Sequence, residues 1–159
     1  MNVWLCQKWK TYYCDKDRRS GVRVDFSKNV NLDVKRAIKE LLAWLRKEYT
    51  FPVRIRIYVA GSYYVKARDG DLVRDLFFWP ENRDDEPYIK IATGDYEHWL
   101  KKIGKDNALS TILIALLKNL THYFQWLNDK NLSLSTLKRQ AKMCADEIMD
   151  DYAEIREHL

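Results

Sequence analysis

The residues with the most specific spacing for chemistry lie in one apolar segment, residues 116–126. Two histidines four residues apart share one face of a helix and can hold a zinc ion, while a glutamate next to the first can act as a general base. In this segment His122 stands at the second histidine position, Lys118 at the first and Asn119 at the glutamate position. The spacing fits a metal-binding helix from which most of the reactive groups are missing.

A second segment continues the pattern. Lys138, Ala141 and Ala145 fit E-x-x-A-x-x-x-A except at its first letter. Together the two segments resemble the gluzincin family of zinc metallopeptidases, and within it the small minigluzincin-like members, in a degenerate form that lacks the H-E-x-x-H ligands. The resemblance covers about residues 30–155. It implies a zincin-like fold and makes Lys118, His122 and Lys138 vestigial metal-site positions, with Lys138 in place of the third ligand, a glutamate.

The chemistry of the replaced positions argues against a working zinc site. A protonated lysine at position 118 is repelled by a divalent metal. Asn119 occupies the general-base position but cannot accept a proton, and the single imidazole of His122 does not hold a catalytic zinc ion. We therefore expect no catalytic residue, no bound metal and no cofactor, with zinc binding expected only if the ligand positions are restored.

The two lysines leave two interpretations open. Lys118 and Lys138 can belong to a structural ion-pair cluster, with Asp146 or Glu147 as partners, because unpaired buried lysines are costly. Alternatively, they can form an anion-binding pocket where the zinc site would be. His122 also has an ordinary interpretation as a hydrogen-bonded structural histidine.

Alternating apolar residues predict the strands around this site. Residues 22–26 and 53–59 predict two strands, and 63–67, 76–79 and 88–92 predict three shorter ones. We interpret the last as the edge strand that binds an extended peptide by strand addition. Its residues are Tyr88, Ile89, Lys90, Ile91 and Ala92.

Helical spacing predicts the other elements. A helix is expected from Leu32 to about Tyr49, capped by Asn31 or Asp33, and a short one over residues 95–101. Two long helices follow, one capped by Asp106 or Asn107 and running to Leu127, the other from Ser133 or Ser135 almost to Leu159. The order predicts an α+β protein with helices packed on one face of a small mixed sheet.

The 159 residues are enough for one domain with a core, so we expect a single metallopeptidase-like domain. The net charge of +5 is uneven: residues 1–24 carry +4 and residues 146–159 carry −5. Residues 1–21 are interpreted as a basic, aromatic N-terminal arm, with a strand or hairpin between Val3 and Cys14.

Three cysteines do not suggest a disulfide framework. Cys6 and Cys14 have no second metal-binding pair with matching spacing, and Cys144 fits a packed helical position. Neither a secretory signal nor an apolar run of about 20 residues is visible, so we expect a cytoplasmic protein without a membrane partner.

Three functions follow from these observations. The first is a catalytically inactive pseudopeptidase that binds a protein or peptide along its edge strand, with Arg54, Arg56 and the aromatic arm widening the surface. The second is a zinc metallopeptidase whose active site has been altered in this chain. The third is a binder of an anionic partner such as nucleic acid, which strong salt dependence would reveal.

Overall fold

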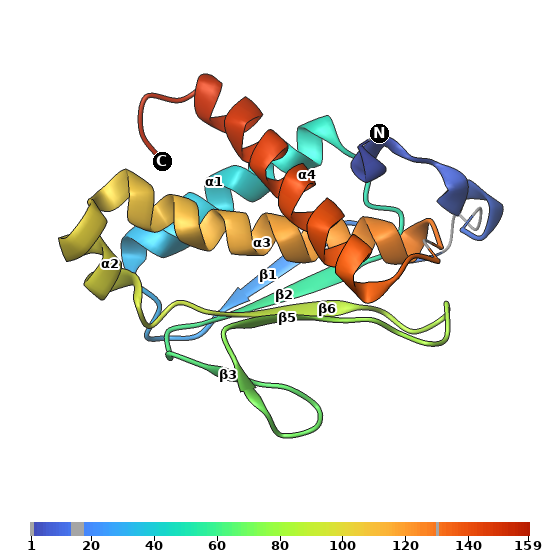
Figure 1. The fold of residues 1–159 in the computed structure, drawn as a ribbon, viewed down its shortest axis with the longest axis horizontal. Helices are drawn as coiled ribbons and strands as arrows, with labels where there is room; N and C mark the ends of the chain where they lie inside the picture. Colours follow the sequence, from blue (N-terminus) through green and yellow to red (C-terminus); the bar gives the residue numbers. More distant parts are fainter. Residues whose placement is uncertain (1, 14–17, 130) are drawn as a thin grey trace.

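The computed structural model describes residues 2–13, 18–129 and 131–159, and is built on a four-stranded mixed sheet. The strands are β1 (Val22–Phe26), β2 (Ile55–Ala60), β5 (Asp75–Phe78) and β6 (Tyr88–Ala92). Their order is β1-β2-β6-β5; the first three are parallel, and β5 is antiparallel to β6. A small hairpin, β3 (Val65–Lys66) with β4 (Leu72–Val73), lies on the side of the sheet away from the helices (Figure 1).

The helices gather on one face of the sheet (Figure 1). They are α1 (Leu32–Glu48), α2 (Tyr96–Ile103), α3 (Lys105–Leu127) and α4 (Leu134–Glu154), preceded by the 3-10 helices η1 (Val3–Leu5) and η2 (Lys8–Thr11). The predicted α+β arrangement, with a small sheet and a long C-terminal helix, is confirmed. The last helix ends at Glu154, so the prediction that it continues almost to Leu159 is wrong by about one turn.

Buried and exposed side chains alternate along the strands because helices cover one face of the sheet. In β2, Ile55, Ile57 and Val59 are almost completely buried, whereas Tyr58 is 40% exposed. The register keeps this division across the sheet, since Ile57 lies beside Ile89 and Tyr58 lies beside Lys90. The sheet therefore has an apolar helix-covered face and an open face that carries polar and aromatic side chains.

α1 has the pattern of a helix that covers a sheet. The Asn31 side chain accepts a hydrogen bond from the Asp33 backbone N–H, which caps the first turn. Its buried side chains recur at helical spacing toward the core. They are Val34, Ala37, Ile38, Leu41, Leu42 and Leu45.

α3 is the central helix, in contact with α1, α2, α4, β5, β6 and η1. Being enclosed on most sides, it is apolar around most of its circumference. Gly104, with φ of +85°, ends α2 and begins α3. This positive φ favours glycine, so the N-cap is Gly104 and not the predicted Asp106 or Asn107.

The N-terminal residues 2–13 form 3-10 turns packed on α3, and the predicted strand or hairpin is absent from this described part of the arm. Trp4 and Tyr13 are buried, and the Trp4 indole N–H donates to Thr121 Oγ1 at 2.9 Å. These aromatic side chains belong to the core. Cys14 lies outside the described residues.

The helices of the described residues are too short or too polar to cross a bilayer.

Candidate functional site

The predicted site lies where α3 meets β5 and α4. Asn119 is only 3% exposed. Its amide Nδ2 donates to the Asp75 carboxylate at 2.9 Å and to the Ala115 carbonyl oxygen at 2.8 Å. Position 119 thus has a neutral donor whose two hydrogens are both used: one joins α3 to β5, and the other bonds to the backbone within α3.

His122 takes part in a network between α3 and α4. Its Nδ1 lies 2.7 Å from Oε1 of the buried Gln125. The Gln125 amide Nε2 donates to the Leu137 carbonyl at 3.0 Å and to Gln140 Oε1 at 2.8 Å. Because both amide hydrogens point to α4, Oε1 is the acceptor and Nδ1 of His122 carries the hydrogen. The lone pair of neutral His122 is therefore on Nε2.

The surroundings of His122 favour its neutral form. Burial lowers the pKa of His122, and the positive charge of Lys138 lowers it further. The hydrogen bond with Gln125 and the negative charge of Asp75 act in the opposite direction but are smaller in sum. The Phe77 ring, 6.4 Å from the imidazole between centroids, supplies apolar surface on the β5 side. His122 is a neutral, hydrogen-bonded residue under ordinary conditions.

The third vestigial position is close enough to act on this histidine electrostatically. Lys138 lies on the exposed side of α4, while Ala141 and Ala145 are buried in the same helix. Small side chains at these two positions let α4 pack closely on α3. Three vestigial positions from two helices are thus brought to one region of the molecule.

The ion-pair interpretation of the lysines does not hold for the described residues, where neither Lys118 nor Lys138 forms an ion pair. Asp146 and Glu147 are exposed further along α4. The site instead combines two lysines with Asp75, whose carboxylate accepts from Asn119. This excess of positive charge leaves the anion-binding interpretation open.

The strand assigned as the peptide-binding edge is not an edge. β6, which contains Tyr88, Ile89, Lys90, Ile91 and Ala92, pairs with β2 on one side and β5 on the other. The edge next to the site is β5. The Arg74 carbonyl accepts from the Ala92 N–H, and alternate residues of an antiparallel strand bond to the neighbour. The backbone groups of Asp75 and Phe77 therefore point outward.

The two other predicted contributors to the peptide surface are also placed elsewhere. Arg56 lies on the open face of the sheet, 3.5 Å from the Asp25 carboxylate, and Arg54 is half-buried before β2. The aromatic arm packs into the core, as described above. The helix that contacts β5 is α3.

Within the ranges that the structure describes, no three His, Cys, Asp or Glu side chains form a group able to hold a metal ion. Cys144 is buried, which confirms that it is a packed residue, and burial raises the pKa of its thiol. The absence of a cofactor stays a prediction.

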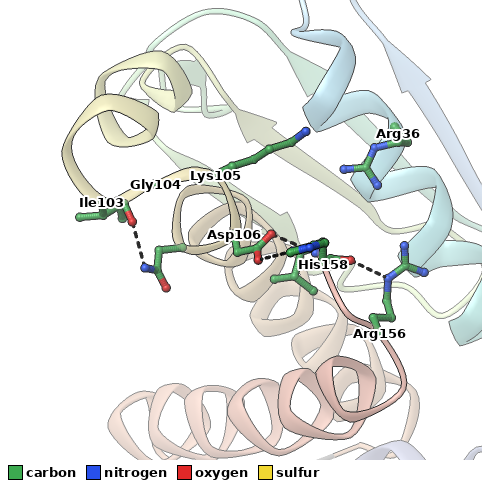
Figure 2. Close-up of a pocket in the computed structure, with 9 residues that line it drawn as sticks. Arg36, Ile103, Gly104, Lys105, Asp106, Arg156 and His158 are labelled. Carbon is green, nitrogen blue, oxygen red and sulfur yellow. Dashed lines mark hydrogen bonds and ion pairs between the residues drawn. The ribbon is translucent and has the colours of Figure 1, made fainter.

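A cavity of about 770 Å³ lies at the other end of α3, beside α1 and the C-terminal tail. Figure 2 shows Lys105 and Arg36 extending toward this cavity from two helices. Arg36 and Arg156 share the Glu40 carboxylate, and Asp106 pairs with His158 at 3.1 Å. The Glu40 pair holds the tail against α1, and the Asp106 pair holds it against the start of α3, so both pairs have a structural role.

Sequence reasoning missed two residues of the vestigial site. Asp75 is 44 positions from Asn119, and its only sequence signal was a carboxylate at the start of an apolar strand. Gln125 had a clearer signal, because a glutamine between Phe124 and Trp126 in a buried helix requires polar partners.

Comparisons with family models, curated proteins and solved structures give no match to this chain.

Proposed function

We propose that this protein is a catalytically inactive, metallopeptidase-like protein that binds an extended peptide along the outer edge of β5. The observation that carries the proposal is the unpaired edge of β5 beside the vestigial site. The outward N–H and C=O groups belong to Asp75 and Phe77, whose side chains contact Asn119 and His122. A peptide added there would lie next to the helix that bears a catalyst in active zincins.

The residues at the vestigial positions support a binding role over hydrolysis. Lys118 carries the wrong charge for a zinc ligand. Asn119 lacks a proton-accepting carboxylate, and both of its amide hydrogens are engaged. His122 alone supplies one ligand, where catalytic zinc needs about three from the protein. A protein with these residues would bind a peptide at the β5 edge without hydrolysing it.

The charges near β5 indicate which peptides would bind best. Lys118 lies one helical turn before His122 on α3, and the charges of Lys138 and Asp75 both act on His122. Carboxylate side chains of a bound peptide would therefore be attracted by the positive charges of the two lysines. We expect acidic extended peptides to bind more tightly than basic ones.

The test is a displayed library of random eight-residue peptides, followed by fluorescence anisotropy with the selected sequences. Phe77→Pro removes the outward N–H, and Phe77→Ala is its matched control because both variants lose the ring. We expect Phe77→Pro to weaken binding at least tenfold relative to Phe77→Ala. Equal affinities of the two variants, or selection of no peptide, would contradict binding at the β5 edge.

A further inference from the structure

We infer that the open face of the sheet is a second binding surface, independent of the β5 edge, and that it binds single-stranded nucleic acid. Among the described residues, the helices lie on the other face, and the β3–β4 hairpin lies on this side of the sheet (Figure 1). The occupant is argued from two observations: aromatic side chains available for stacking, and positive charges around them.

The aromatic side chains follow neighbouring strands. Tyr58 of β2 lies 6.1 Å from Tyr88 of β6, and Tyr88 stacks on Phe78 of β5 at 4.8 Å between centroids. The guanidinium of Arg68 lies over the Phe78 ring, 4.8 Å from its centroid, so this end of the row stabilises the sheet itself. Tyr58, 40% exposed, ends the row with a ring that is open to a ligand.

A second exposed tyrosine faces the same cavity as Tyr58. The cavity measures about 540 Å³ and lies between the sheet and the hairpin. Tyr64, which is 51% exposed, lines it together with Tyr58, Lys66 and Lys90. The guanidinium of Arg74 lies 5.8 Å from the Tyr64 ring centroid, farther than that of Arg68 from Phe78, and the exposed ring surfaces of the two tyrosines are of the kind on which unpaired bases stack.

The charges of this face match a phosphate backbone. Lys90 is directly opposite Tyr58 in the register, and its Nζ donates to the Lys66 carbonyl at 3.1 Å, which holds the ammonium over the cavity. Arg56 and Arg23 are neighbours on the same face. Asp25 is the acid that lines the cavity, and it lies 3.5 Å from Arg56.

Single-stranded nucleic acid accounts for both features at once. An acidic peptide would use the cations but has no need of exposed tyrosines, and a duplex presents its bases stacked and paired. Single strands expose both bases and phosphates, and proteins bind them with aromatic platforms inside basic grooves. Recognition of this kind tolerates many sequences, so we expect weak base preference.

The probes for the test are fluorescein-labelled dT and U 20-mers, titrated with the intact protein and followed by anisotropy. Tyr58→Ala and Tyr64→Ala should each weaken binding about tenfold, the size expected for loss of one stacking side chain. Tyr58→Phe, which keeps the ring, should bind like the original protein. Lys90→Ala should reduce the slope of log affinity against log salt by about 0.7, the value for one phosphate contact on a single strand.

Three control variants test whether the effect belongs to this face. Tyr12→Ala removes an exposed tyrosine and Lys142→Ala removes an exposed lysine, both elsewhere on the protein; neither should change the affinity. Phe77→Pro should also leave it unchanged, which separates this surface from the β5 edge. The inference would be overturned by absence of saturable binding at about 50 mM salt, by unchanged affinity in both tyrosine-to-alanine variants, or by equally good displacement with polyglutamate.

Discussion

The amide of Asn119 donates to the Asp75 carboxylate at 2.9 Å, and this contact joins the central helix to the edge strand of the sheet. Asn119 is the residue that the resemblance to gluzincins aligns with a general base, and Asp75 belongs to the edge strand β5. In this structure the amide at position 119 is a fixed donor. A glutamate at this position could not make the contact, because two carboxylates would repel one another.

Removal of this amide should therefore destabilise the protein. Asn119→Ala leaves the Asp75 carboxylate without its donor in a half-buried site, and we expect the free energy of unfolding to fall by about 1–3 kcal/mol. Urea titration followed by circular dichroism measures this change. Asn107→Ala, at an exposed position of the same helix, should cost about 0.5 kcal/mol or less.

A double-mutant cycle distinguishes the contact from simple loss of packing. If Asn119 and Asp75 interact as described, Asn119→Ala combined with Asp75→Ala should cost less than the two single changes added together. Additive effects would contradict a direct interaction between the two side chains.

Replacement of Gln125 by an apolar residue should destabilise the protein, although its neighbours Phe124 and Trp126 are apolar. It bonds to His122, Leu137 and Gln140, so Gln125→Leu leaves several partners unsatisfied between α3 and α4. We expect a loss of about 1–3 kcal/mol in the free energy of unfolding, measured by the same titration. Gln140→Leu, which removes one of these bonds, is the comparison and should cost less. An unchanged stability of Gln125→Leu would contradict the network.

The stability should also depend on pH through His122. Its pKa in the folded protein is lowered from the usual 6.5 by burial, so the unfolded chain binds more protons between the two values. Stability is then greatest above about pH 6.5 and falls as the pH decreases toward the folded-state pKa. His122→Gln should make the free energy of unfolding less dependent on pH between about 7.5 and 5. An unchanged pH dependence would show that His122 is not the group responsible.

Periodicity predicted most of the secondary structure because it records which faces are buried. β2 and α1 were found correctly, since Ile55, Ile57 and Val59 alternate and α1 has apolar residues at helical spacing. The order of the strands in the sheet cannot be predicted from this pattern. β6 carries Tyr88 and Lys90 on its open face and so has the pattern of an edge strand, although it is paired on both sides.

The site was predictable only where its residues share a helix. Lys118, Asn119 and His122 lie on one part of α3 because of their spacing, whereas Lys138 was assigned to the same site only through the family resemblance. Asp75 reaches Asn119 from a distant strand, which depends on how the sheet is ordered. The 3-10 turns of the N-terminal arm were missed because Val3 and Trp4 occur in a short segment where alternation and turn formation look alike.

Restoring the ligand positions tests the resemblance to zinc peptidases directly. Nε2 of His122 is available as one zinc ligand. Lys118→His adds a second histidine ligand, Lys138→Glu adds the third ligand, and Asn119→Glu adds a base. Asp75→Asn is added, because a carboxylate at position 119 would face the Asp75 carboxylate. We expect the four changes to give about one tightly bound zinc ion per chain, since two imidazoles and a carboxylate form a complete protein ligand set. Metal analysis after gel filtration measures the stoichiometry, and His122→Ala in the same background should abolish binding. A folded but metal-free variant would contradict the placement of Lys138 at the third ligand position and with it the zincin-like arrangement of α3 and α4.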